Sequence, residues 1–202
     1  VSLYSLYKKD PVEDMLARLD ESGHISNVGS RYAVVAKLLC RQEWDLKEKL
    51  RDGQVIIFDK YLLSFFTTEL VRGCELPELL EMTATLAIPD VTFWMDIDPE
   101  HALTRKSTIG FREAGLDILS DNHQQPFDFN KYLYGDYSDD LLRRCYMKFQ
   151  NKVKETMASL LQDYPQKWGK KTVHVPFGKG LNETHQFIVE RLEMKEKMEG
   201  IF

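Results

Sequence analysis

The sequence lacks several features that would each point to a class of protein. No apolar run approaches the roughly 18–20 residues that cross a bilayer, and no charged-then-apolar signal segment opens the chain. An excess of positive charge is also missing, because 27 Lys and Arg stand against 32 Asp and Glu for a net charge of −5. These absences argue against a membrane protein and a general nucleic-acid binder, and they predict a cytoplasmic protein.

Cysteine is scarce as well. Cys40, Cys74 and Cys145 are odd in number and lack the paired spacing of zinc ligands. We therefore expect reduced thiols that pack as small apolar side chains.

What is present is the composition of a globular protein, with 43% hydrophobic and 29% charged residues in a chain of 202. Repeats and Gly/Ser-rich linkers are absent, which predicts a single domain over residues 1–202. Short continuous apolar runs alternate with longer helical periods, the pattern of an α/β fold with a parallel sheet. The expected strands are 1–6, 55–58, 91–96 and 172–175, and the expected helices are 12–19, 30–51, 62–71, 77–87, 142–160 and 181–193.

Several local signals set these boundaries. Gly53 follows the long helix at the place where a left-handed residue commonly closes one. An apolar stripe of that helix comprises Val35, Leu38, Leu39, Leu46 and Leu50. The strand 55–58 consists of four consecutive apolar residues, which predicts cover on both faces. Asp98 precedes Pro99 and is expected to cap a helix.

Residues 107–137 lose apolar periodicity and carry several glycines. A connection of this length is unusual in a compact domain unless it is functional. We therefore expect a functional flap in this region.

Two expected strands end in a carboxylate, at Asp59 and at Asp96. Ligands of open parallel sheets bind beyond the carboxyl ends of the strands, so these ends predict a site. Five basic residues are placed to surround phosphate oxygens there: Arg41, Lys60, Arg105, Lys106 and Arg112. The alternatives remain open, since a strand-ending Asp can cap a turn and each basic residue can belong to a solvated face.

Two blocks carry a family resemblance. Residues 53–64, GQVIIFDKYLLS, resemble the thymidylate kinase pattern G-x-x-V-I-x-D-R-Y-x-x-S. Residues 89–105, PDVTFWMDIDPEHALTR, are similar to that family's P-D-L-T-F-L-L-D-V-D-P-E-x-A-L-x-R, in the same order. The resemblance covers nearly the whole chain. It implies a P-loop kinase-like three-layer α/β/α fold built on a parallel sheet.

The resemblance further implies a nucleoside-monophosphate kinase, in the first place a dTMP kinase that transfers the γ-phosphoryl group of ATP to dTMP with Mg²⁺ and forms dTDP. Asp59 would orient the acceptor or contact Mg²⁺ through water, and Lys60, at the family's Arg, would bind the acceptor phosphate. Tyr61 and Ser64 would support this loop. Arg41 lies near the family's helix arginine that contacts the acceptor. A homodimer is one expected assembly.

The lid of the family corresponds to about residues 105–137. Arg105, Lys106 and Arg112 would belong to it, with Arg105 and Arg112 acting on the transferring group. The family's aromatic-Gln-Gly segment, which contacts the base, is missing from residues 64–73, where Thr68 and Glu69 stand nearby.

No G-x-x-x-x-G-K-[ST] motif occurs in the sequence, and Val1 is not an initiator methionine. We therefore expect that the family's first strand, P-loop and first helix, roughly 25–35 residues by the size of a βα unit, precede this sequence. Three functions stay open: a monophosphate kinase when complete, a kinase-fold binding module without catalysis, and a deoxynucleoside kinase.

Overall fold

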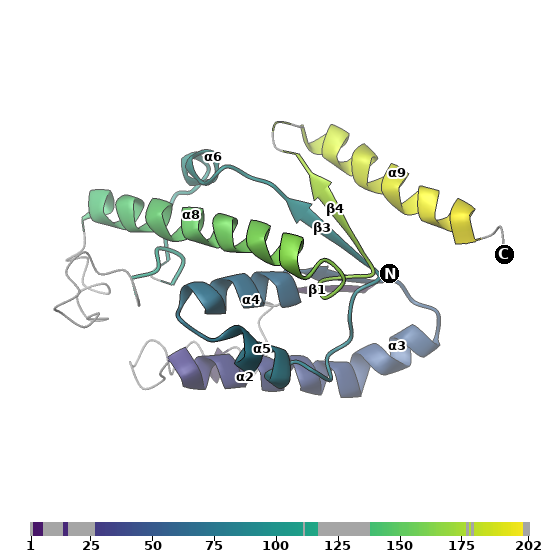
Figure 1. Cartoon of the computed structure of the whole chain (residues 1–202). Helices are drawn as coiled ribbons and strands as arrows, with labels where there is room; N and C mark the ends of the chain where they lie inside the picture. The colour runs from purple at the N-terminus through teal and green to yellow at the C-terminus, as the bar shows by residue number, and fades with distance from the viewer. Residues whose placement is uncertain are drawn as a thin grey trace. The chain divides into compact units, whose positions relative to one another are not determined.

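The computed structural model describes residues 2–5, 14–15, 27–110, 112–116, 138–176, 178 and 180–199. It confirms a mixed α/β fold with parallel strand pairing. The chain forms two compact units, one of Val1–Ala87 with Ser107–Asp163 and one of Ile88–Lys106 with Tyr164–Phe202 (Figure 1). Most of the expected helix 12–19 and the flap beyond residue 116 lie outside the described residues. In the described part, no helix is both long and apolar enough to cross a membrane.

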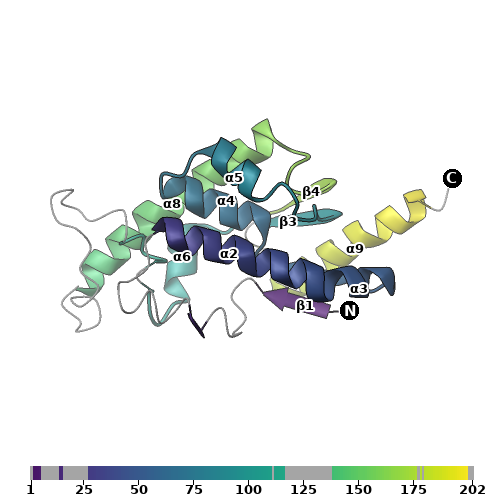
Figure 2. The same cartoon turned by 90° about the horizontal axis from the view of Figure 1, so that it is seen from below.

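The long helix of the first unit is confirmed, and it begins three residues earlier than expected. It runs through α2 (Asn27–Arg41), the π-helical turn η1 (Gln42–Leu46) and α3 (Lys47–Arg51) as one continuous rod (Figure 2). The inclusion of Leu50 in the buried stripe is wrong, since Leu50 is 52% exposed. A π turn holds more residues than an α turn, so η1 shifts the buried face of the residues that follow it. Gly53 ends the rod with φ +72°, as predicted.

Strand β2 (Ile56–Asp59) pairs in parallel with β1 (Ser2–Ser5), in a register that places Ser5 opposite Asp59. The strand is confirmed one residue later than expected. Cover on both faces is wrong, because Ile57 is 49% exposed while Ile56 and Phe58 are half-buried. Both strands therefore end on the same side, where Asp59 leads into the next helix.

Helix α4 (Leu62–Val71) has the bounds that the sequence predicted, and it carries the fully buried Phe66. Helix α5 (Leu76–Met82) is shorter than expected, since residues 83–87 are not helical. The amide of Ala87 donates to the side chain of Gln42 instead of to a helical carbonyl. A tertiary hydrogen bond has thus replaced the last helical turn.

Helix α8 (Asp139–Asp163) lies alongside α4 in the first unit, where Phe149 packs on Val71 (Figure 1). Gly115, in the turn at residues 112–116, faces this contact with φ +65°. A Cβ added at Gly115 would lie 2.5 Å from Phe149 Cδ2, so glycine is required there.

The second unit contains β3 (Val91–Met95), α6 (Pro99–Thr104), β4 (Lys171–Val175) and α9 (Leu181–Glu199). Strands β3 and β4 pair in parallel, with Trp94 opposite His174. Asp98 caps α6 as predicted, because its Oδ1 accepts from the amides of Glu100 at 2.9 Å and His101 at 3.4 Å.

Candidate functional site

The carboxyl end of β2 forms a tight turn into α4. Asp59 is the last residue of the strand and is exposed, and Lys60 follows it with φ +62°. Lys60 is the one residue other than glycine with a positive φ in the described part of the chain. Such a conformation costs about 1–3 kcal/mol and persists where the surroundings impose it, often at functional sites.

Tyr61 imposes the shape of this turn. Its ring stacks on Phe58 with centroids 4.3 Å apart and planes at 19°, so an aromatic contact joins the residues on either side of Asp59 and Lys60 in the chain. The Tyr61 hydroxyl donates to the carbonyl of Ala87 at 3.1 Å. Burial raises the pKa of Tyr61 to about 12, so the phenol keeps its proton at neutral pH. Tyr61 is thus held in place by contacts of both its ring and its hydroxyl.

Ser64, Thr68 and Glu69 lie along α4. The Thr68 hydroxyl donates to the Ser64 carbonyl at 2.8 Å, a bond within the same helix. Glu69 is 7% exposed, and its two carboxylate oxygens face Arg31 Nε at 3.0 Å and Arg72 Nη1 at 3.5 Å. In the structure Glu69 therefore contacts two arginines of its own chain.

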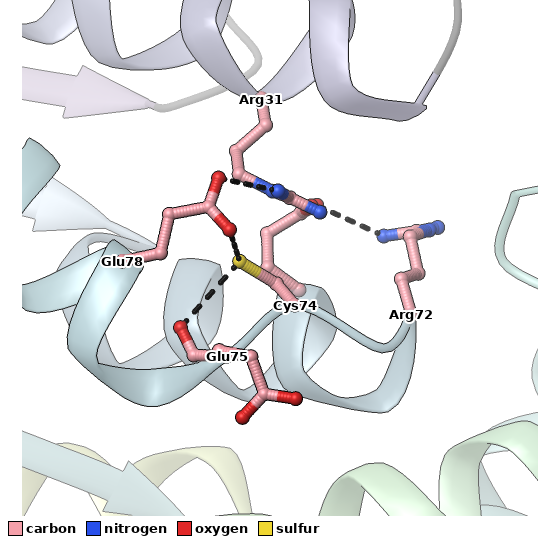
Figure 3. Close-up of polar contacts among 6 residues, drawn as sticks. Arg31, Arg72, Cys74, Glu75 and Glu78 are labelled. Carbon is pink, nitrogen blue, oxygen red and sulfur yellow. Dashed lines mark hydrogen bonds and ion pairs between the residues drawn. The ribbon is translucent and has the colours of Figure 1, made fainter.

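These arginines belong to a buried polar network that links α2, α4 and α5 (Figure 3). Arg31 also pairs with Glu78 at 2.9 Å, and the thiol of Cys74 donates to the Glu78 carboxylate at 3.3 Å. Burial, followed by the hydrogen bond to Glu78, raises the pKa of Cys74 to about 11. Cys74 is therefore a neutral thiol and a poor nucleophile at neutral pH.

Arg72 extends the network to the turn at residues 112–116. It donates to the carbonyl of Arg112 at 3.1 Å and lies over the ring of Phe149, 5.4 Å from its centroid. Gln150 donates to the next carbonyl, that of Glu113, at 3.0 Å. The backbone at Arg112 is thus anchored on α4 and α8.

The remaining predicted residues fall in both units. Arg41 ends α2 in the first unit and is half-buried. Arg105 and Lys106 follow α6 in the second unit, where Arg105 Nη2 lies 2.9 Å from His101 Nε2. Asp96 lies just beyond β3 and contacts His174 Nε2 at 3.0 Å.

The described residues offer few candidate ligands for a metal ion. Among the described residues, no group of three or more His, Cys, Asp and Glu side chains could hold a metal ion. Asp59 offers one exposed carboxylate at the strand end. This fits Mg²⁺, which proteins commonly hold through one or two carboxylates together with waters and substrate phosphates.

Comparison with known proteins identifies relatives of one kind, although no protein-family model matches the chain. The chain is 26% identical over 159 residues to a thymidylate kinase of Chlorobium chlorochromatii, covering 76% of this chain and 62% of that protein. It is 24% identical over 185 residues to a thymidylate kinase of a Thermoanaerobacter species, covering 90% of this chain and 74% of that protein.

A probable thymidylate kinase 2 of Saccharolobus solfataricus is 31% identical over 85 residues, which is 40% of each chain. The proteins to which this chain is similar are thus named as thymidylate kinases. The chain spans less than two thirds of the length of the Chlorobium and Saccharolobus proteins.

Two buried polar residues of the long helix were missed by the sequence reasoning. Arg31 is 5% exposed and Gln42 is 7% exposed, and both lie on the buried face of the long helix with Val35 and Leu38. The signal was present, because the apolar stripe continues at helical spacing through positions 31 and 42. Polar side chains on such a stripe need buried hydrogen-bond partners, and the sequence alone does not predict which residues these are.

Proposed function

We propose that the protein is a nucleoside-monophosphate kinase that transfers the γ-phosphoryl group of ATP to dTMP or a closely related monophosphate. The observation that carries the proposal is the Asp59-Lys60-Tyr61 turn, which stands at the carboxyl end of a parallel strand in a chain whose relatives are named thymidylate kinases. In this reaction an acceptor phosphate oxygen bonds to the γ-phosphorus as the bond to the β-phosphate oxygen breaks, and ADP leaves.

The acceptor phosphate binds at Lys60 in this proposal. The Lys60 side chain is exposed at the start of α4, whose N-cap residue Tyr61 makes no capping hydrogen bond with its own side chain. The first amides of α4 point toward the same end, and a helix N-terminus favours an anion. Arg41, which ends α2, supplies a second positive charge to the acceptor.

Asp59 is the residue that would hold Mg²⁺ in this proposal. The ion, when bound, offsets the negative charge of the phosphates. The chain's own contribution is an exposed carboxylate that the strand end fixes next to Lys60. Arg112, whose carbonyl accepts from Arg72, adds positive charge to the transferring group.

Glu69 shapes the acceptor side of this site through its neighbours. Its carboxylate is held by Arg31 and Arg72, which fixes the position of α4. Ser64 and Thr68 lie on the same helix.

The protein acts in the cytoplasm in this proposal and can assemble as a homodimer.

The test is an assay of the protein translated from its complete coding sequence. With Mg²⁺ and ATP, we expect turnover of dTMP or of a related pyrimidine monophosphate in a panel of all common monophosphates and deoxynucleosides. Turnover of nucleosides alone would indicate a deoxynucleoside kinase. Absence of turnover with every acceptor would indicate a binding module and would overturn the proposal.

Two substitutions connect the activity to the site. Asp59→Asn keeps the size of the side chain and removes its charge, so we expect kcat to fall about 10²–10³-fold. Lys60→Arg keeps the charge and adds a second donor for phosphate, so we expect an acceptor KM equal to that of the wild type or lower. Wild-type kcat in Asp59→Asn would contradict the assignment of the site.

A further inference from the structure

The side chain of Gln42 makes two hydrogen bonds with the backbone of the segment Thr85–Ala87, one as donor and one as acceptor. Its Nε2 donates to the Thr85 carbonyl at 2.8 Å, and its Oε1 accepts from the Ala87 amide at 2.7 Å. The residue is 7% exposed and opens the π-helical turn η1, directly after Arg41. Both polar ends of the Gln42 amide are thus satisfied by the backbone of one short segment.

Tyr61 binds the same segment from another element. Its hydroxyl donates to the Ala87 carbonyl at 3.1 Å, while its ring stacks on Phe58. Tyr61 follows Lys60 directly in the chain. The single residue Ala87 therefore joins Gln42, through its amide, to Tyr61, through its carbonyl.

We propose that the segment Thr85–Ala87 is a brace that sets Arg41 and Lys60 in their places for binding the acceptor monophosphate, with Gln42 and Tyr61 as positioning residues. This inference rests on the proposed function, because it assigns acceptor binding to those two cations. Each cation is the immediate chain neighbour of a side chain that Ala87 holds. The brace thus connects the end of α2 to the turn after β2.

The turn at Lys60 needs such support. A lysine with φ +62° is strained and relaxes to negative φ unless its neighbours prevent it. The stack of Tyr61 on Phe58 and the bond to Ala87 hold the residue after Lys60 in place. A shift of about 1 Å in a binding group is enough to cost up to about 10²-fold in rate, so loss of the brace affects the acceptor first.

The test compares the steady-state kinetics of three variants of the complete protein. Tyr61→Phe removes the hydroxyl and keeps the stacked ring, and Gln42→Leu removes both amide bonds at similar volume. We expect each to raise the acceptor KM about tenfold with kcat and the KM for ATP nearly unchanged. The acceptor KM of the double variant should be about the same as that of one single variant, because both side chains act through one peptide segment.

Thr83→Val is the matched control. Thr83 is 3% exposed and its hydroxyl donates to the Leu79 carbonyl at 2.7 Å, so removal of the hydroxyl also breaks a buried bond close to the brace. It contacts neither Gln42 nor Tyr61 through that bond. We expect a lower melting temperature with an unchanged acceptor KM.

The outcomes separate the brace from the proposed function. An active wild type with the same acceptor KM in Tyr61→Phe overturns the brace alone, and so does a multiplicative effect in the double variant. A wild type that neither phosphorylates nor binds any monophosphate overturns the proposed function and the brace with it. Should Gln42→Leu fail to fold, Tyr61→Phe decides the question.

Discussion

Arg31 Nε lies 3.0 Å from Glu69 Oε2, and the two side chains are only 5% and 10% exposed. Hydrogen bonds and ionic contact with Glu69, together with contributions from Cys74 and Glu78, outweigh the effect of burial and raise the pKa of Arg31. The pair joins α2 to α4 across 38 residues of sequence.

Arg31→Met should destabilise the fold by about 3 kcal/mol, because it leaves the buried carboxylate of Glu69 with only its longer contact to Arg72 and removes the partner of the half-buried Glu78. Urea unfolding followed by circular dichroism measures the loss. The control is Lys47→Met, which breaks an exposed pair with Glu43 at 2.6 Å and should cost about 0.5 kcal/mol or less. Equal losses of unfolding free energy in the two variants would mean that the network around Arg31 adds little to the stability of the fold.

Gly115→Ala should destabilise by more than about 3 kcal/mol, since the new Cβ meets Phe149 at 2.5 Å and the backbone has φ +65°. Gly53→Ala is the matched control. Its φ is +72° and nothing lies within 4 Å of the added Cβ, so only about 1 kcal/mol of backbone strain is expected. The difference between the two melting temperatures isolates the steric part.

Lys60→Gly should separate stability from acceptor binding. Glycine relieves the positive φ of residue 60 and should stabilise the fold by about 0.5–1 kcal/mol, while loss of the ammonium group raises the acceptor KM. Lys60→Ala removes the same charge and keeps the strain. It should therefore raise the KM without any gain in melting temperature, and a gain in both variants would refute the role of strain.

Cys74 should make the protein less stable at alkaline pH. Its pKa rises from 9.0 to about 11 on folding, chiefly through burial, so below pH 9 both states keep the proton. Between pH 9 and 11 the unfolded chain releases its proton first, which favours unfolding by about 1 kcal/mol near pH 10.

The measurement is the free energy of unfolding at pH 8 and pH 10 for the wild type and for Cys74→Ser. The serine variant keeps a donor for Glu78 and lacks a group that titrates in this range, so its loss of stability should be smaller. An identical pH dependence in the two proteins would contradict the raised pKa of Cys74.

Local signals predicted much of this fold and part of the site. The bounds of α4, the cap at Asp98 and the closing glycine at Gly53 all depend on interactions within a few residues. The position of Asp59 at a strand end followed from the apolar run before it. The family resemblance then supplied the roles that Asp59 and Lys60 are proposed to have.

The sequence by itself determined the α/β class, the bounds of α4, the cap at Asp98, the closing glycine at Gly53 and the strand end that carries Asp59, because periodicity and capping are encoded by near neighbours. Only the tertiary structure decided that Glu69 pairs with Arg31 and that Ala87 lies between Gln42 and Tyr61. These partners are 26 to 45 residues apart in the chain. A buried polar group must find a partner, and packing of the helices determines which one it meets.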